Sequence, residues 1–192
     1  MCYTVLIKKV DIFIQKNINR KKKIIACDMD MTVIDVETIN LIAKEIIKNK
    51  NIIELTKKAM NGEISFQKSI INRTKMLKGV NIKDIINLIK KINITPGVKS
   101  VIKTMNKFGY HTMLISGGYD IIANKIGQEI GFKEVFSNSL QVKNNVLTGN
   151  LDGNVVDRNG KLNILNKRVS SLKINTKDTL AVGDGDNDIA MI

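Results

Sequence analysis

Two carboxylates, one residue apart, follow directly after a short apolar run in this sequence. The run Ile24-Ile25-Ala26-Cys27 leads into Asp28-Met29-Asp30-Met31-Thr32. Such a run is typical of a strand buried on both faces of a parallel sheet, and ligands of these sheets bind just beyond the carboxyl ends of the strands. Asp28 and Asp30 are therefore placed for chemistry. Taken alone, the stretch fits equally well a strand that ends in an ordinary polar turn.

Two later apolar runs also end in polar signatures. Residues 110–115 stop at Ser116-Gly117-Gly118, and residues 179–182 continue into Gly183-Asp184-Gly185-Asp186-Asn187-Asp188. Parallel strands present their carboxyl ends at one edge of the sheet, so the three signatures are expected to converge. Asp28, Asp184 and Asp188 would then crowd one site, and a hard cation such as Mg²⁺ relieves their repulsion. The hydroxyl and amides of 116–118 suit phosphate oxygens, and a metal beside a phosphate site indicates phosphoryl transfer.

Each signature has a weaker interpretation by itself. Ser-Gly-Gly is common in simple turns, and Asp-x-Asp occurs in metal sites of several chemistries. The acidic run that begins at Asp184 resembles a calcium loop, but Ile189 occupies the sixth position, where that loop requires Gly. His111, the single histidine, falls within a strand pattern and is not expected to be catalytic.

The elements that must position these residues alternate between strand and helix patterns. The patterns predict strands at 23–27, 110–115 and 179–182, helices at 95–108, 119–130 and 161–173, and a hairpin within 134–157 around Asn144-Asn145. Thr95 and Pro96 predict the start of the first of these helices. This rhythm predicts an α/β fold, a parallel sheet with helices on both faces.

Residues 36–93 show four helical patterns and no strand signal. The patterns cover about 36–49, 51–60, 63–78 and 81–92. We therefore expect a core built from 24–35 and 94–192 that carries a helical insertion at 36–93. Residues 1–23 form a basic segment with strand patterns at 3–7 and 11–14, to which we assign no role.

Composition limits the classes of function. The 192 residues are 43% hydrophobic, enough for one domain with an insertion, and neither a secretory signal nor a membrane span is recognisable. The two cysteines fit a reducing, cytoplasmic location. The net charge of +13 is spread along the chain except at Arg20-Lys21-Lys22-Lys23, and aromatic residues are only 4%. This argues against a nucleic-acid surface and for a general attraction of small anions.

Over about residues 24–192 the chain resembles the haloacid dehalogenase-like phosphatases. The matching motifs are Asp28-Met29-Asp30-Met31-Thr32, Glu37-Thr38-Ile39, Ala59-Met60-Asn61-Gly62, Phe66 with Arg73, Thr95-Pro96-Gly97, Ser116-Gly117-Gly118-Tyr119-Asp120, Lys161, and Val182-Gly183-Asp184-Gly185-x-Asn187-Asp188. The resemblance implies a Rossmannoid parallel sheet, with helices on both faces and an inserted helical-bundle cap at 36–93. The motifs inside the cap match the branch of the family that hydrolyses O-phosphoserine.

The resemblance also implies roles for residues of the core. Asp28 would be the nucleophile that forms an aspartyl-phosphate, and Asp30 the acid and base that serves the leaving group and the water. Mg²⁺ would be held by the Asp28 carboxylate, the Asp30 backbone carbonyl and Asp184, with Asp188 nearby. Phosphoryl oxygens would be bound by three residues, Ser116, Gly117 and Lys161, while Asn187 orients the site.

In the cap, the resemblance implies that Arg73 pairs with the substrate carboxylate and that Glu37 faces its ammonium group. Met60 and Phe66 would shield the substrate. Without the resemblance, Arg73 and Glu37 fit a solvated helix surface, and Met60 and Phe66 fit packing within the cap.

The expected function is Mg²⁺-dependent hydrolysis of O-phosphoserine to serine and phosphate, the last step of serine biosynthesis, by a monomer or homodimer. One alternative is a phosphatase or phosphotransferase for another small phosphomonoester, such as phosphohomoserine. Another is an inactive or truncated binding protein of the same fold, with its basic N-terminus on nucleic acid. Three departures from the family pattern bear on this: Met31 replaces the usual Ser, Asp186 replaces a small residue, and the sequence stops within a helix where relatives add a further edge strand.

Overall fold

The computed structural model describes residues 3–7, 10–14 and 21–192, with side chains from residue 21 onward except that of Met60. At the N-terminus, β1 (Tyr3–Ile7) and β2 (Val10–Ile14) pair as an antiparallel hairpin, in which Tyr3 lies opposite Ile14. The strands expected at 3–7 and 11–14 are thus confirmed. Within the described part of the chain, no helix is both long and apolar enough to cross a membrane.

The main sheet positions the three polar signatures. Its strands are β3 (Ile24–Cys27), β4 (His111–Tyr119), β5 (Glu134–Lys143), β6 (Val146–Asp152) and β7 (Thr179–Val182). They lie in the order β6-β5-β4-β3-β7, and only β6 runs antiparallel to its neighbour. Because the chain moves from β3 to β4 on one side and later returns to β7 on the other, the strand order reverses at β3. Ligand sites of open α/β sheets lie at such a reversal, beyond the carboxyl ends of the strands.

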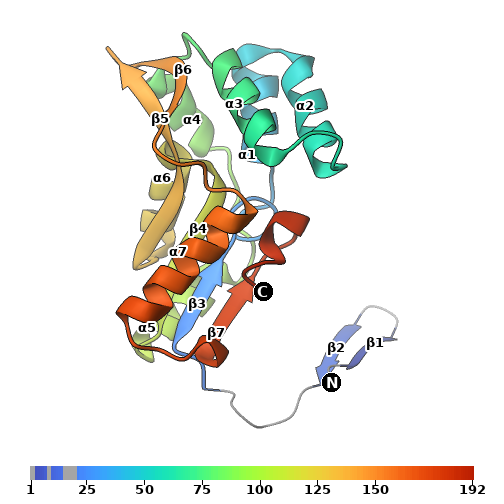
Figure 1. Cartoon of the computed structure of the whole chain (residues 1–192), viewed down its shortest axis with the longest axis vertical. Coiled ribbons are helices and arrows are strands. Elements are labelled where there is room, and N and C mark those ends of the chain that lie inside the picture. The colour runs from blue at the N-terminus through green and yellow to red at the C-terminus, as the bar shows by residue number, and fades with distance from the viewer. Residues whose placement is uncertain (1–2, 8–9, 15–20) are drawn as a thin grey trace.

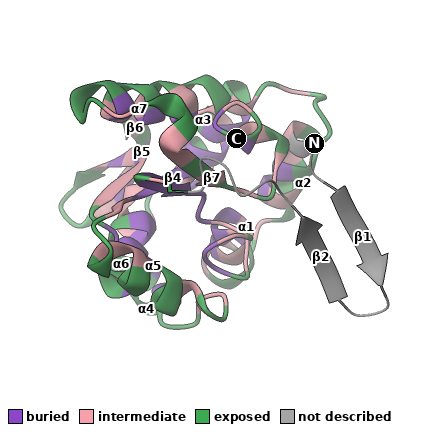
Figure 2. Cartoon of the chain, turned by 90° about the horizontal axis from the view of Figure 1, so that it is seen from below, coloured by how far each residue is buried: buried purple, intermediate pink, exposed green. Residues whose placement is uncertain are grey.

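Helices cover both faces of this sheet, as the sequence predicted. Viewed along the strands, α7 (Arg158–Ser171) lies on one face, and α5 (Val98–Lys107) and α6 (Asp120–Ile130) lie on the other (Figure 2). Strand β3 is buried on both sides, and its residues alternate between the two faces of the sheet. Ile24 and Ala26 pack into the core cluster under α7, whereas Ile25 and Cys27 pack into the larger cluster under α5 and α6.

A group of helices is inserted between β3 and α5. It comprises α1 (Thr38–Ile42), a π-helical turn η1 (Ala43–Ile47), α2 (Lys50–Met60), α3 (Phe66–Met76) and α4 (Ile82–Ile89). Figure 1 shows α1, α2 and α3 above the carboxyl ends of the strands. The side chains of Asn49, Ser65 and Asn81 cap α2, α3 and α4 by accepting backbone N–H groups. A bridge between Ile34 and Ile94 joins the two chain segments that enter and leave the insertion.

Several predicted boundaries were wrong, among them the start of α7, at Arg158 rather than 161, and two of these errors bear on the site. The helix after the insertion begins at Val98 rather than at Pro96, because Gly97 has a left-handed φ of +91°, which a residue inside a helix cannot adopt, and is therefore the N-cap. Before it, the Thr95 N–H donates to the Val33 carbonyl (2.9 Å). The second strand does not stop at Ser116. It continues to Tyr119 through a shift in its register with β5, so the Ser-Gly-Gly turn is a bulged strand end.

The remaining short elements agree with the predicted rhythm. Asn144 and Asn145 both have positive φ (51° and 62°), which is the conformation of a two-residue hairpin turn between β5 and β6. The 3₁₀ turns η2 (Thr176–Asp178) and η3 (Asp186–Asp188) flank β7, which occupies one edge of the sheet. As a result, the three signatures at 28–32, 116–118 and 183–188 meet at one end of the sheet.

Candidate active site

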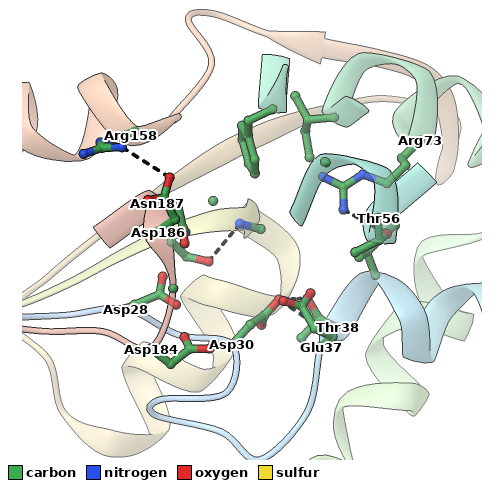
Figure 3. Close-up of a pocket in the computed structure, with 18 of the residues that line it drawn as sticks. Asp28, Asp30, Glu37, Thr38, Thr56, Arg73, Arg158, Asp184, Asp186 and Asn187 are labelled. Atoms are coloured by element: carbon green, nitrogen blue, oxygen red, sulfur yellow. Dashed lines mark hydrogen bonds and ion pairs between the residues drawn. The ribbon is translucent and has the colours of Figure 1, made fainter. Parts of the chain in front are cut away.

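A cavity of about 750 Å³ lies where the three strand ends meet the inserted helices. Its lining includes Asp28, Ser116 and Asp184 from the strand ends, and Glu37 and Arg73 from the insertion. Figure 3 shows Asp28, Asp30 and Asp184 grouped on the sheet side, with Arg73 and Thr56 across the cavity. The site therefore has one half formed by the core and one half formed by the helices.

Three carboxylates cluster in the core half. Oxygen atoms of Asp28, Asp184 and Asp188 all lie within 4.8 Å of one another. One ammonium group balances them in part, because Lys161 Nζ donates to Asp28 Oδ1 and, at 2.6 Å, to Asp188 Oδ1. Lys161 is only 1% exposed. This donor set of carboxylate oxygens, with more negative than positive charge, fits a hard divalent cation such as Mg²⁺.

Local structure fixes these side chains in place. Lys161 lies in the first turn of α7, whose N-cap Asp157 accepts the Gly160 N–H at 2.8 Å. Asp188 is fully buried and also accepts the Gly185 N–H at 3.2 Å, within η3. It packs so closely against Gly183 that any side chain at that position would overlap it. The Gly at position 183 is therefore required by the close approach of Asp188.

The electrostatics of Asp28 follow from this crowding. Burial raises the pKa of Asp28 to about 6, the positive charge of Lys161 opposes the rise, and the negative charge of Asp188 adds to it. A bound cation would favour the ionised carboxylate, which is the form that a nucleophile needs.

Asp30 has a different environment from Asp28. Its Oδ2 accepts hydrogen bonds from the Thr38 N–H (3.2 Å) and from Thr38 Oγ1 (2.9 Å), while its buried Oδ1 has no partner among the described residues. Burial, then the charges of Glu37 and Asp28, raise the pKa of Asp30 well above its usual value. Asp30 therefore keeps a proton at a pH where an ordinary carboxylate has lost it, as a general acid must.

The Ser-Gly-Gly signature forms a tight turn at the end of β4, on the other side of β3 from the Asp184 segment. Ser116 is buried, and its Oγ accepts the Gly118 N–H at 2.9 Å. The Phe66 ring packs over Gly117, since a Cβ at that position would come within 3.0 Å of it. Ser116, Gly117 and Gly118 all line the cavity, and the Ser116 hydroxyl can still donate to a phosphate oxygen there.

Asn138, on β5, fixes this turn from behind. Its Nδ2 donates to the Gly117 carbonyl (2.8 Å), and its Oδ1 accepts the Val156 N–H (2.8 Å). The side chain is 1% exposed. Val156 leads directly into α7, so Asn138 connects the Ser116 turn with the segment that positions Lys161.

The other half of the cavity is organised around Arg73. The guanidinium is buried, at 5% exposure, and it donates to Thr56 Oγ1 (3.2 Å) and to the Ser69 carbonyl (3.4 Å). Its Cζ lies 5.8 Å from the centre of the Phe66 ring. In the described part of the chain no carboxylate forms an ion pair with Arg73. Arg73 is thus a buried cation with neutral partners rather than part of a solvated helix surface.

Glu37 lies between the two halves and lines the same cavity. Burial raises the pKa of Glu37, and the charge of Arg73 opposes the rise. Figure 3 shows Glu37 beside Asp30 and Thr38. An ammonium group that entered the cavity would find a carboxylate there.

The rim of the cavity holds the residues of the third signature. Asn187 lines it, and Asp186 pairs with Arg158 at 3.2 Å, with the two side chains 78% and 46% exposed. Asp186 and Arg158 line the cavity as well, so the additional charge at Asp186 is paired with an arginine at the rim. Met31 is outside the lining, half-exposed, and has a φ of +55°.

Among the remaining candidates, Phe66 lines the cavity, whereas the side chain of Met60 is not among those that the structure describes. His111 lies at the start of β4, the end opposite to the cavity. Its Nε2 is 2.9 Å from Glu134 Oε2. This agrees with its exclusion from the catalytic residues.

Comparison with known proteins agrees with this geometry. The family model described as haloacid dehalogenase-like hydrolase matches residues 25–192. The chain belongs to this family. Curated relatives named phosphoserine phosphatase come from Methanocaldococcus jannaschii (41% identity, 90% of this chain and 82% of the relative), Lactococcus lactis (36%, 89% and 79%) and Archaeoglobus fulgidus (33%, 91% and 51%).

Solved structures of family members have the same fold. A phospho-aspartyl intermediate analogue of phosphoserine phosphatase superposes with a TM-score of 0.81 at 41% identity, over 90% of this chain and 82% of that one. A substrate-bound phosphoserine phosphatase complex gives a TM-score of 0.82 at 40% identity, with the same coverage of both chains. The predicted haloacid dehalogenase-like α/β fold and family membership are thereby confirmed.

Three residues of this haloacid dehalogenase-like site had no role in the sequence-based prediction, namely Thr38, Asn138 and Tyr119. Thr38 and Tyr119 lie inside matched motifs, yet their types alone do not reveal their hydrogen bonds. Asn138 lies in an alternating strand pattern, where a buried polar residue is the available signal, but burial at that position depends on the tertiary fold.

Proposed function

We propose that this protein hydrolyses O-phosphoserine to serine and phosphate. One observation carries the proposal: carboxylates that a buried lysine supports from behind the lining stand at one end of a single cavity, and a buried arginine that forms no ion pair within the described residues stands at the other. A substrate that carries both a phosphoryl group and a carboxylate complements the two ends. The relatives named phosphoserine phosphatase, at 33–41% identity, support the same assignment.

Asp28 is the proposed nucleophile. Its carboxylate oxygen attacks phosphorus, the bond between phosphorus and the seryl oxygen breaks, and an aspartyl-phosphate forms. Asp30 donates its proton to the departing seryl oxygen, and the raised pKa of Asp30 keeps that proton available. Asp30 then accepts a proton from water, the water oxygen attacks phosphorus, and Asp28 is released together with phosphate.

The transferring group gathers negative charge on its oxygens, and several residues are available to bind them. In the proposal the Ser116 hydroxyl, the amides at Gly117 and the Lys161 ammonium hold these oxygens. Asn187 orients the site from the rim. Asn138 fixes the position of the Ser116 turn relative to the segment that carries Lys161.

We propose Mg²⁺ as the cofactor, held by the carboxylates of Asp28 and Asp184 together with the backbone carbonyl of Asp30, with Asp188 nearby. The bound ion would offset the charge of the carboxylate cluster and of the phosphoryl oxygens. Removing divalent ions with EDTA should abolish phosphate release, and Mg²⁺ should restore it. Asp184→Asn should raise the Mg²⁺ concentration that gives half-maximal activity by about tenfold or more, a magnitude typical of lost metal contacts. Activity that persists in EDTA would contradict the metal assignment.

The inserted helices at 36–93 form the proposed cap over a core of 24–35 and 94–192. In the cap, Arg73 would pair with the substrate carboxylate through its guanidinium fork, and Glu37 would face the ammonium group. Phe66 would shield the substrate, and Met60 keeps the same role as a prediction. A cytoplasmic enzyme that acts as a monomer or homodimer completes the proposal, consistent with the free, buried thiol of Cys27.

The deciding experiment measures phosphate release from O-phosphoserine with Mg²⁺ for the wild type, Asp28→Asn and, as a matched control, Asp152→Asn. Asp152 is an exposed carboxylate at the end of β6, outside the cavity lining. We expect release by the wild type and the control and a loss of at least a thousandfold in Asp28→Asn. Equal release by all three would contradict the nucleophile assignment. If none of the three releases phosphate although their circular dichroism spectra are those of folded protein, the alternative of an inactive binding protein of the same fold is favoured.

The choice of amino-acid substrate is tested at Arg73. Replacement by Met keeps the apolar stem and removes the charge, so KM for O-phosphoserine should rise by about a hundredfold, since a charged hydrogen-bonded pair contributes about 3 kcal/mol. Hydrolysis of p-nitrophenyl phosphate, which has no carboxylate, should change much less. Equal losses on the two substrates would assign Arg73 to the structure of the cap instead.

A further inference from the structure

Tyr119 joins the two halves of the cavity. It directly follows the Ser116-Gly117-Gly118 turn on β4, and its ring is buried at 1% exposure. Its hydroxyl lies 2.9 Å from Thr74 Oγ1, on α3 of the inserted helices. Thr74 is the residue next to Arg73. A single hydrogen bond therefore links the segment of the phosphate-binding turn with the segment of the carboxylate-binding arginine.

The direction of this hydrogen bond follows from the other contacts of Thr74. Thr74 Oγ1 donates its hydrogen to the Ile70 carbonyl at 2.7 Å, as serine and threonine often do within helices. The Thr74 oxygen is then free only to accept, so the Tyr119 hydroxyl is the donor. Both side chains are buried, and Thr74 is the described partner of this hydroxyl.

Helix α3 contacts the phosphate-binding segment at a second point. Phe66, its first residue, packs its ring over Gly117, as described above. Contacts at both ends of the helix, Phe66 on Gly117 and Thr74 on Tyr119, hold α3 at a fixed position along the segment 116–119. Arg73 lies between the two contacts in sequence, beside the second.

We propose that the Tyr119 hydroxyl is a positioning group that sets the distance between the phosphate-binding turn and Arg73, and thereby selects substrates by length. The inference rests on the proposed function, because it concerns a substrate that spans the two halves. O-phosphoserine would match the distance that this bond enforces. Phosphohomoserine, which is longer by one methylene group, would be disfavoured by the same constraint.

A merely structural role for Tyr119 makes a different forecast. Loss of a packing contact would reduce the amount of folded protein and lower activity on every substrate in proportion. Loss of a positioning contact changes the ratio between substrates, because only those that reach Arg73 depend on its distance from the turn. The ratio of kcat/KM values is therefore the informative measurement.

Tyr119→Phe removes the hydroxyl and keeps the ring, and Thr74 retains its bond to the Ile70 carbonyl. A buried neutral hydrogen bond contributes about 0.5–1.5 kcal/mol, so we expect kcat/KM for O-phosphoserine to fall about fivefold, mainly through KM. The preference for O-phosphoserine over phosphohomoserine should fall at least threefold. The loss on p-nitrophenyl phosphate should be less than half of that on O-phosphoserine. Tyr110→Phe, a half-buried tyrosine before β4 and outside the cavity lining, is the matched control.

A double-mutant cycle with Thr74→Val separates positioning from folding. Thr74→Val alone leaves the Tyr119 hydroxyl buried without a partner and is expected to destabilise the fold, whereas the double variant leaves two apolar groups in contact. The double variant should regain stability yet keep the altered substrate ratio of Tyr119→Phe.

The possible results are distinct. If the wild type does not hydrolyse O-phosphoserine, the proposed function fails and this inference fails with it. If the wild type is active and Tyr119→Phe leaves the substrate ratios unchanged, or lowers all three activities equally, the inference alone is overturned. A lower preference for O-phosphoserine over phosphohomoserine in both Tyr119→Phe and the double variant supports the inference.

Discussion

Asn138 offers a sharp test of how the Ser116-Gly117-Gly118 turn is held. Its amide orientation is determined by its neighbours, because the Val156 N–H must meet an oxygen and the Gly117 carbonyl must meet an N–H. Asn138→Ala leaves both of these backbone groups without their partner. Each unpaired buried group costs about 1–3 kcal/mol, and a water molecule in the space left by the amide would recover part of this. We expect the free energy of unfolding to fall by about 2–4 kcal/mol.

Asn138→Asp separates the two hydrogen bonds. The carboxylate can still accept from Val156, but when ionised it turns a charged oxygen toward the Gly117 carbonyl in place of an N–H, so the defect acts on the Ser116 turn. We expect kcat for O-phosphoserine to fall by about tenfold or more, at a Mg²⁺ requirement close to that of the wild type. The loss in kcat should exceed any change in KM, because in the proposed mechanism the Ser116 turn binds the transferring group.

Urea denaturation, with midpoint and slope compared to the wild type, measures the first effect, and phosphate release at saturating substrate measures the second. The control is Asn150→Ala, an exposed asparagine on β6 whose side chain bonds only to Gln141 (3.2 Å). It should change stability by less than about 0.5 kcal/mol. A cost below about 0.5 kcal/mol for Asn138→Ala, with activity within twofold of the wild type, would refute the positioning role.

Three further predictions follow from local features. In EDTA, the raised pKa of Asp28, about 6, means that the folded state keeps a proton which the unfolded chain releases near pH 4. The corresponding stability, ~3 kcal/mol at most, is present at low pH and lost as the pH rises through 6. Added Mg²⁺ should therefore raise the urea midpoint more at pH 7.5 than at pH 4.5, and an equal effect at both would contradict this. Met31→Asn should stabilise the protein by about 0.5 kcal/mol in the same assay, because Asn tolerates the positive φ of 55° better and the Met side chain is half-exposed; a loss of stability would count against it. Asp186→Ala should change stability by less than about 0.5 kcal/mol and kcat/KM by less than twofold, because its ion pair with Arg158 is exposed; a fivefold loss of activity would show that the charge matters.

Much of the fold could be predicted because its signals are local. Apolar runs at 24–27 and 179–182 give β3 and β7 at or within one residue of the predicted bounds. The capping side chains of Asn49, Ser65 and Asn81 stand beside the helices that they begin, so the helical insertion was also readable. The convergence of the three signatures then followed from the direction of parallel strands.

The two wrong boundaries that bear on the site have a tertiary cause. Thr95 and Pro96 form a sound helix start in isolation, but Ile94 and Thr95 are paired with the segment at Val33 and Ile34, and the helix starts only after the left-handed Gly97. Likewise, the turn at Ser116 continues as strand because Tyr119 pairs with Asn138 on β5. Neither partner is visible to a pattern that considers neighbouring residues only.

The residues of the candidate site also fall into those that local patterns predict and those that they do not. Asp28, Ser116 and Asp184 could be found because each follows a strand pattern directly. Lys161 and Arg73 belong to a chain with 31 lysines and arginines, and only the family resemblance selected them. What distinguishes these two in the structure is burial, at 1% and 5% exposure, and burial is a property of the assembled fold.

The two buried cations differ in a way that bears on the substrate. Lys161 has its counter-charges in the protein, from Asp28 and Asp188, and these carboxylates still leave the core half negative overall. The described hydrogen-bond partners of Arg73 are neutral, and Glu37 acts on its charge without forming an ion pair with it, so this buried charge is only partly compensated, which is costly. Each half is therefore incomplete in the opposite sense, one lacking positive charge and the other lacking negative charge. A metal ion with a phosphoryl group completes the first half and a carboxylate completes the second. Because α3 is fixed to the phosphate-binding segment through Phe66 and Tyr119, a single small molecule that carries both groups satisfies the two halves together, whereas a phosphate ester without a carboxylate leaves the Arg73 half uncompensated.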